Sequence, residues 1–328
     1  MMSVKGRRLL LLAILVAISL TFLFALSVGA ANVSDPWRYI FNPQLQGLGH
    51  EIIWQIRFPR ILAALLIGMA LGVAGALSQS ATNNPLADPS IIGTTAGASL
   101  GATIAIVLNI ASIGTIGVTI AAVIGAFIAS ILTIALSRSA LQLVIIGIAT
   151  SAIISSAVGV AISIADKPEA RSISFWSLGS LSLVTMDSVK LLAPIILISA
   201  VIGWYYSQRM DLLALGDREV IHLGINPQRM RLIAFLIISI LIATSVSVVG
   251  TIPFLALAAP HITRYLIGPQ NRPLMIGSAV IGAGLLLIAD TAARTIAPPM
   301  ELPIGLITSL VGAPILILIL RKSGEVWR

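Results

Sequence analysis

The sequence predicts an all-α integral membrane protein with about ten transmembrane helices in a single domain over residues 1–328. Hydrophobic residues make up 58% of the chain and charged residues only 10%, whereas about 25% of a soluble domain is charged. The few charges lie between long apolar runs. Because each crossing of a bilayer needs roughly 20 apolar residues, the chain can supply about ten crossings with short loops and has no room for a separate soluble domain.

Charge-free stretches place the helices in order along the chain. Two of the longer apolar runs are divided by turn-forming residues, one at residues 109–114 and one at Gly250 and Pro253, because glycine and proline interrupt regular structure. The predicted helices cover residues 9–30, 60–80, 90–108, 113–137, 141–164, 188–207, 231–249, 253–267, 273–291 and 303–321.

Lysine and arginine residues indicate how the chain is oriented. With ten helices, 13 of the 20 Lys and Arg residues fall on the side of both termini, and the other seven fall on the opposite side. Cytoplasmic loops carry an excess of these residues, so both termini are predicted to be cytoplasmic in a plasma or inner membrane. An alternative is that residues 1–30 are a signal peptide with a cleavage site at Val28-Gly29-Ala30, which would leave nine helices.

The distribution of ionisable residues bears on the transport mechanism. None falls in the middle of a predicted helix, whereas ion-coupled transporters and proton pumps usually carry such residues deep in the membrane. An ion-coupled secondary transporter is therefore the less favoured class. None of the four lysines follows a glycine, as the lysine of a nucleotide-binding P-loop does. If transport is active, ATP must be hydrolysed by another polypeptide.

Catalytic and metal-binding patterns are also missing from the sequence. It contains no cysteine and three isolated histidines, whereas protein metal sites usually combine three or four ligands. There is no Ser-His-Asp or paired-carboxylate arrangement, so we predict no cofactor, no metal site and no enzymatic reaction. The basic residues are scattered rather than clustered, so nucleic acid is not an expected partner, whereas membrane lipid is.

Residues 208–230 form the one sizeable segment predicted on the cytoplasmic side. Its charged residues surround an apolar side formed by Leu212, Leu215, Val220 and Leu223. Gly216 separates two potential short helices, and Asp217 is a candidate N-cap of the second. The segment is either an ordinary interfacial loop or a coupling segment that docks into a groove on a motor subunit.

A predicted loop at residues 82–90 contains Asn84, Pro85 and Asp88. Asparagine, proline and aspartate are typical of turns. The loop is a candidate cytoplasmic gate, and the alternative is a purely structural turn.

Three arginines, Arg57, Arg60 and Arg294, lie at helix ends predicted on the outer side. Arg57 and Arg60 are three residues apart, which places them on one side of a helix. Guanidinium forks suit contacts with carboxylates of another protein, although such residues also anchor helices by snorkelling. Arg294 follows Asp290 by four residues, so an intrahelical ion pair is the alternative there.

Ten short motifs occur in one order over residues 57 to 321. They are Arg57-Phe58-Pro59-Arg60; Gln79 with Asn84-Pro85-Leu86-Ala87-Asp88-Pro89; Gly93 with Gly97-Ala98; Trp176 with Gly179-Ser180; Leu215-Gly216-Asp217 with Leu223-Gly224; Gly250-Thr251-Ile252-Pro253-Phe254; Pro260-His261-Ile262-Thr263-Arg264; Asp290 with Arg294; Glu301-Leu302-Pro303-Ile304-Gly305; and Gly312-Ala313-Pro314. Each motif alone is weak. Together they resemble the permease family of type II ABC importers for iron-siderophores, haem and cobalamin, often called the FecCD family.

The resemblance implies a type II ABC importer permease fold and a set of partners. Two permease subunits, identical or different, would enclose one translocation pathway, with two ATP-binding-cassette ATPase subunits and an extracytoplasmic substrate-binding protein. Arg57, Arg60 and Arg294 resemble residues that dock the binding protein. The residues that would couple to the ATPase are Leu215, Gly216, Asp217, Leu223 and Gly224.

The resemblance also implies import by alternating access, with an iron(III)-siderophore chelate as the expected cargo and haem or cobalamin as alternatives. We expect a largely apolar cavity lined with Ser and Thr residues, which would hold a bulky chelate by shape. A membrane subunit that only scaffolds a complex would account for the helices. It would not account for ordered motifs on both faces.

Overall fold

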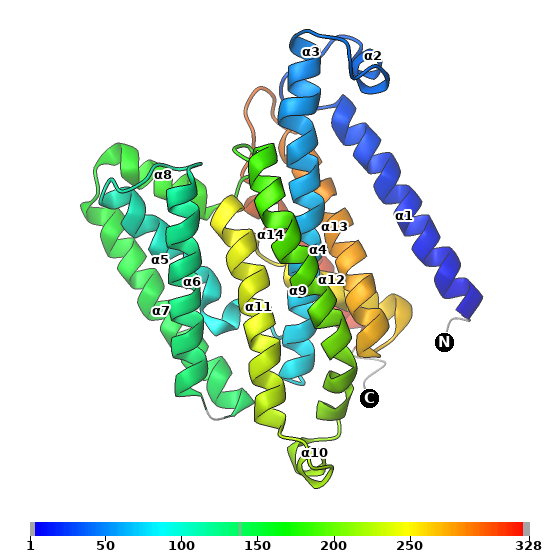
Figure 1. Cartoon of the computed structure of the whole chain (residues 1–328), viewed down its shortest axis with the longest axis vertical. Helices are drawn as coiled ribbons and strands as arrows, with labels where there is room; N and C mark the ends of the chain where they lie inside the picture. The colour runs from blue at the N-terminus through cyan, green and yellow to red at the C-terminus, as the bar shows by residue number, and fades with distance from the viewer. Residues whose placement is uncertain (1–3, 138, 324–328) are drawn as a thin grey trace.

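The computed structural model describes residues 4–137 and 139–323, and every regular element in these two ranges is a helix (Figure 1). All ten predicted helices are present. They are α1 (Val4–Ser27), α4 (Phe58–Ala81), α5 (Thr94–Val107), α6 (Ile116–Leu136), α7 (Ala140–Ile164), α9 (Met186–Leu213), α11 (Pro227–Val249), α12 (Leu255–Ile267), α13 (Asn271–Ala293) and α14 (Ile304–Ser323).

Four helix ends differ by four residues or more from their predicted positions: the starts of α1, α5 and α11 and the end of α9. Helix α9 continues six residues beyond the predicted end at residue 207, and Met210 and Leu213 in this extension are buried. Helix α11 begins four residues early, at Pro227, because the Asn226 side chain accepts hydrogen bonds from the backbone N–H groups of Gln228 and Arg229. This N-cap satisfies N–H groups that have no partner within the helix.

Several short helices were not predicted from the sequence. They are α2 (Pro36–Phe41), α3 (Leu48–His50), a π-helical segment η1 (Glu51–Arg57), a 3₁₀ segment η2 (Pro89–Ile92) and α8 (Lys167–Ser177). Helix α10 (Asp217–His222) is the second of the two short helices expected on either side of Gly216. Segment η1 runs directly into α4. Pro59 has no N–H to donate and its ring crowds the carbonyl four residues earlier, which accounts for the wider π turn just before it.

Six stretches in the described part of the chain are long and apolar enough to cross a membrane. They are Leu48–Ala81, Ile116–Leu136, Leu141–Ile164, Met186–Leu213, Pro227–Val249 and Asn271–Ala293. Shorter apolar stretches lie in α1, α5 and α14. Helix α12 has only 13 residues, which is about 20 Å at 1.5 Å per residue. It is therefore shorter than the hydrocarbon core of a bilayer, which is about 30 Å thick. The chain is a multi-pass membrane protein.

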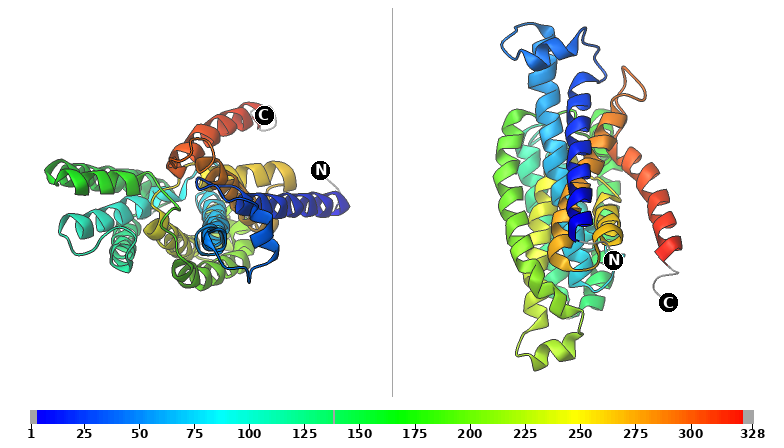
Figure 2. Two further views of the ribbon diagram at one scale, coloured as in Figure 1. Left: turned by 90° about the horizontal axis from the view of Figure 1, so that it is seen from above. Right: turned by 90° about the vertical axis from the view of Figure 1, so that its right-hand side faces the viewer.

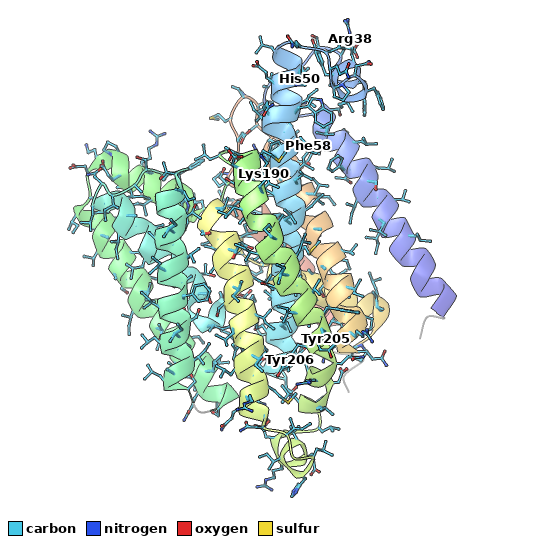
Figure 3. The ribbon with its side chains drawn as sticks, viewed as in Figure 1. Arg38, His50, Phe58, Lys190, Tyr205 and Tyr206 are labelled. Atoms are coloured by element: carbon cyan, nitrogen blue, oxygen red, sulfur yellow. The ribbon has the colours of Figure 1, made fainter. Side chains whose placement is uncertain are left out.

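The two ends of the bundle carry different segments. Figure 1 places α2 and α3 at one end, here the α2 end, and α10 at the other, here the α10 end. In Figure 3, Arg38, His50 and Lys190 lie toward the α2 end, whereas Tyr205 and Tyr206 lie toward the α10 end. Arg38 and Lys190 are two of the seven basic residues predicted on the side opposite to both termini and to residues 208–230. They do lie at the end of the molecule opposite to α10.

Helix α4 forms the centre of the bundle and packs closely against α12 and α13. A Cβ atom added at Gly68, Gly72 or Gly75 would lie 2.4, 2.0 or 1.7 Å from a backbone carbonyl oxygen of Gly282, Ser278 or Ala256. No side chain fits at such distances, so these glycines allow the backbones to touch. In lipid, close approach of this kind is a main source of helix association. The glycines of α4 therefore serve packing within the chain.

This packing gives a first prediction. Gly72→Ala should lower the apparent unfolding temperature in detergent, although alanine is more favourable than glycine inside a helix by about 1 kcal/mol. Overpacking of a close contact costs roughly 1–3 kcal/mol and outweighs that gain. The matched control is Gly159→Ala in α7, because a Cβ atom there meets nothing within 4 Å. Equal unfolding temperatures for the two variants would contradict the packing argument.

Helices at the outside of the bundle keep large apolar surfaces. Viewed from above, α1, α7 and α14 lie at the periphery (Figure 2). In the most apolar window of α7 only 17% of the residues are buried, against 78% for the stretch that contains α4. Ile153 and Ile164 of α7 are 70% and 77% exposed. In water such a surface would be unstable, so these faces contact lipid or another membrane subunit.

Candidate functional site

A cluster of charged residues lies where α4 begins and α13 ends, toward the α2 end. We call it the arginine cluster, and its members are Arg57, Arg60, Asp290, Arg294 and Glu301. Arg60 Nε donates to Asp290 Oδ1 at 2.8 Å, and Arg60 Nη1 donates to Glu301 Oε2 at 2.8 Å. Arg294 Nε lies 3.3 Å from Asp290 Oδ2. One fully buried carboxylate thus lies between two arginines from different helices.

The same arginines hold the end of α1. Arg57 donates to the carbonyl oxygens of Leu26 and Ala31, at 2.8 and 2.6 Å. Arg294 donates to those of Ala25 and Val28, at 2.8 and 3.1 Å. The last carbonyls of a helix have no partner within it, and cations are favourable at that end. The arginine cluster therefore fixes the C-terminal end of α1 to α4 and α13.

These contacts bear on the predicted roles of the three arginines. Arg57, Arg60 and Arg294 are only 4%, 5% and 2% exposed, and their guanidinium groups bind partners within the chain. The intrahelical pair of Asp290 and Arg294 is confirmed. Docking of a binding protein by these side chains stays a prediction, and their burial in the single chain does not support direct contact. The sequence interpretation missed the pairing of Arg60 with Asp290, which lies 230 residues away.

At the α10 end, the candidate coupling segment folds into the short helix α10 between two glycines. Gly216 and Gly224 have φ angles of 95° and 75°, which residues with a Cβ rarely adopt. Leu215, Ile221 and Leu223 are 58%, 59% and 58% exposed. We refer to these three exposed apolar residues, in and beside α10, together as the α10 apolar face. Exposed apolar clusters rimmed by charge mark interaction surfaces.

Two details of this segment were predicted wrongly. Val220 was expected on one apolar side with Leu212, Leu215 and Leu223, but it is fully buried and anchors α10 to the bundle. Asp217 was a candidate N-cap, but Gly216 occupies the cap position and no side-chain cap bond forms. The sequence interpretation omitted Ile221, which is as exposed as Leu215 and Leu223.

The carboxylate of Asp217 instead pairs with Arg231 of α11. Arg231 Nη1 and Nη2 donate to its two oxygens at 2.9 and 2.7 Å. These hydrogen bonds, and the positive charge of Arg231, hold the pKa of Asp217 below its usual value. A carboxyl with a lowered pKa contributes stability above the pKa of the unfolded chain, about 3.9. That contribution is lost only as the pH falls through the lowered value, so the pair persists at neutral pH.

In the loop of residues 82–90, polar side chains mainly stabilise turns. The Asn84 side-chain oxygen accepts a hydrogen bond from the backbone N–H of Leu86 at 2.9 Å. The Asp88 carboxylate accepts one from the backbone N–H of Ser90 at 2.8 Å. These contacts agree with the structural-turn interpretation of the loop. A gating role for Asn84, Pro85 and Asp88 stays a prediction.

A cavity of about 470 Å³ lies beside this loop. Its walls come from residues 88–90 and 249–254, with side chains of α4, α5, α11 and α12. Most of the lining is apolar, and the hydroxyl-bearing lining residues are Ser90, Thr95, Ser245 and Thr251. Ligand sites typically span 300–1,000 Å³ and combine an apolar wall with a few polar groups. Asp88 is the one charged residue among the described lining residues.

Comparison with known proteins gives a consistent result. Residues 11–322 match the FecCD transport family. The hemin transport system permease protein HmuU of Yersinia pestis is 37% identical over 316 residues, which are 93% of this chain and 95% of that protein. The iron(3+)-hydroxamate import system permease protein FhuB of Bacillus subtilis is 34% identical over 323 residues, which are 97% of this chain and 84% of that protein.

A solved structure shares the whole architecture. A protein described as a metal-chelate type ABC transporter, in an inward-facing conformation, aligns with a TM-score of 0.87 and 29% identity, and the alignment covers 95% of this chain and 99% of that one. The all-helical bundle is thus the type II ABC importer permease fold that the motifs implied. The chain belongs to the FecCD transport family and is a permease subunit of an ABC transporter, not itself an enzyme.

Proposed function

We propose that this permease imports an iron(III)-siderophore chelate. The observation that carries the proposal is the wall of the 470 Å³ cavity. Proteins that hold haem iron do so through His, Cys, Met or Tyr, and none of these is among the described lining residues. A siderophore already saturates its iron, so it needs shape and a few hydroxyl groups rather than ligands from the protein.

The relatives support this cargo class without deciding within it. FhuB is named for iron(3+)-hydroxamate import, and FeuB of Bacillus subtilis, 35% identical over 335 residues, is named for iron uptake. HmuU is named for hemin transport. Haem is therefore the second candidate cargo, and the 37% identity to HmuU is the observation that favours it.

The proposed assembly contains a second permease subunit, two ATPase subunits and an extracytoplasmic binding protein. The exposed apolar faces of α7 and α14 offer area for a second subunit as well as for lipid. Both termini and the α10 end would be cytoplasmic, since Arg209, Arg218 and Arg229 gather near α10 and basic residues favour that side.

In the proposed cycle, the α10 apolar face and its flanking Gly216 and Gly224 fit a groove on the ATPase. A loaded binding protein docks at the α2 end, where the arginine cluster has three positive and two negative charges. ATP binding and hydrolysis move α10, and the helices around the cavity rock between outward-open and inward-open arrangements.

The test is reconstitution into vesicles with the candidate ATPase and the candidate binding protein, loaded with a ferric hydroxamate or with haemin. We expect uptake of the ferric chelate only when both partners and ATP are present. Uptake of haemin with no uptake of the chelate would replace the proposed cargo by the second candidate. Uptake without the ATPase would contradict the ABC mechanism and favour a secondary transporter.

A further inference from the structure

Arg231 lies in the second turn of α11 and is only 8% exposed. Each of its three guanidinium nitrogens donates a hydrogen bond. Nη1 and Nη2 bind the carboxylate of Asp217, the first residue of α10, and Nε binds the carbonyl oxygen of Ala81 at 2.9 Å. One rigid, planar group from α11 therefore holds the start of α10 and the end of α4 together.

Ala81, which accepts the hydrogen bond from Arg231, lies at the junction between α4 and the loop of residues 82–90. It is the last residue of α4, and the loop of residues 82–90, which contributes to the cavity wall, follows immediately. Carbonyl groups in the last turn of a helix lack partners within the helix. Arg231 satisfies one of them and thereby connects α10 to the junction between α4 and the loop.

Neighbouring side chains add parallel links between the same parts. Asn83, in the loop, donates to the carbonyl oxygen of Leu213 at the end of α9, at 2.6 Å. Asp211 of α9 accepts from the side chain of Asn271 at 2.9 Å, and Asn271 in turn accepts from the hydroxyl of Ser80 in α4. Ser80, just before Ala81, and Asn83, two positions after it, are thus both linked to α9, the helix that leads into α10. Asn83 contacts α9 directly, and Ser80 is linked to it through Asn271.

We propose that Arg231 is a positioning residue that transmits movement of α10 to the end of α4 and to the cavity loop. This inference rests on the proposed coupling of α10 to an ATPase. The family resemblance implied that Asp217 couples to the ATPase. Within this inference, Asp217 instead ties α10 to the membrane helices. The planar fork matters, because the single ammonium of a lysine cannot hold two carboxylate oxygens and a carbonyl in this geometry.

The test compares Arg231→Lys and Asp217→Asn with the unmodified chain in the reconstituted transporter. We expect ATPase association and basal hydrolysis to be retained. Hydrolysis stimulated by the binding protein, and cargo taken up per ATP, should fall by about 5-fold or more, the usual scale of coupling between sites. Arg229→Lys is the matched control, because Arg229 is an exposed arginine two positions away. The Arg229→Lys variant should leave ATPase association, basal hydrolysis, stimulated hydrolysis and the cargo taken up per ATP unchanged.

A distance measurement separates transmission from a merely structural role. The chain has no native cysteine, so spin labels can be placed at His222→Cys in α10 and Leu86→Cys in the loop, both exposed positions. Labelled chains are diluted among unlabelled ones, so that only the distance between the two labels of one chain is measured. In the chain with native Arg231, that distance should not change when nucleotide is added. In the Arg231→Lys background, we expect nucleotide to change that distance, because α10 moves without the loop.

The outcomes are distinct. Full coupling and an unchanged label distance in both variants would overturn the role of Arg231. Loss of ATPase association in the variants alone would also overturn it, since Arg231 would then only shape the docking surface. If the unmodified chain fails to associate with any ATPase, the proposed function fails instead.

Discussion

Replacing Leu215 or Leu223 by aspartate is expected to abolish association between this permease and its ATPase. Each leucine is 58% exposed in the chain alone and would become buried in the complex. Burial of a leucine contributes about 1.5–3 kcal/mol, and a charged residue that loses its water at an interface adds a further cost. Together these effects predict at least about a 100-fold loss of affinity, because each 1.4 kcal/mol is a factor of ten.

The measurement is co-purification of the ATPase with the permease in detergent, followed by titration of binding. Leu215→Met is the matched control, because methionine keeps the apolar character and nearly the same volume. Neither aspartate variant should lower the unfolding temperature of the permease alone, since both leucine side chains are exposed. Unaltered association of Leu215→Asp and Leu223→Asp would show that the α10 apolar face is not the docking surface.

The sequence predicted the membrane helices well because lipid imposes a simple requirement. A crossing needs about 20 apolar residues, and charged residues such as Arg209 and Arg229 are confined to the ends. Short elements outside this requirement were missed. Helix α8 begins at Lys167-Pro168, and the π-helical segment η1 lies just before Pro59. The sequences of both are neither long nor uniformly apolar.

The candidate sites were predicted less completely than the helices. Residue type and position along the chain correctly placed Leu215 and Leu223 on an exposed surface. Nothing in the local sequence shows that Arg60 meets Asp290 or that Asp217 meets Arg231, because these pairs depend on how α4, α10, α11 and α13 pack. Val220 was misplaced for the same reason, since a six-residue helix has two sides and only packing decides which is buried.

Replacing Asp290 by asparagine is expected to destabilise the permease strongly. Asp290 is fully buried, and its carboxylate lies between Arg60 at 2.8 Å and Arg294 at 3.3 Å. Asparagine keeps the size and removes the charge, so Arg294 is left buried without a counter-ion, while Arg60 retains Glu301 at 2.8 Å. Removing one partner of a buried ion pair typically costs about 3–5 kcal/mol. The apparent unfolding temperature in detergent measures this loss.

Two comparisons identify the cause of that loss. Asp187→Asn removes an exposed pair with Lys190, whose side chains are 90% and 71% exposed, and exposed pairs contribute only about 0–1 kcal/mol. Asp290→Asn combined with Arg294→Met removes both charges and should be more stable than Asp290→Asn alone, because no unpaired charge remains. If Asp290→Asn unfolds at the temperature of the unmodified chain, the arginine cluster does not stabilise the fold. Its arginines would then be free to serve a binding protein at the α2 end.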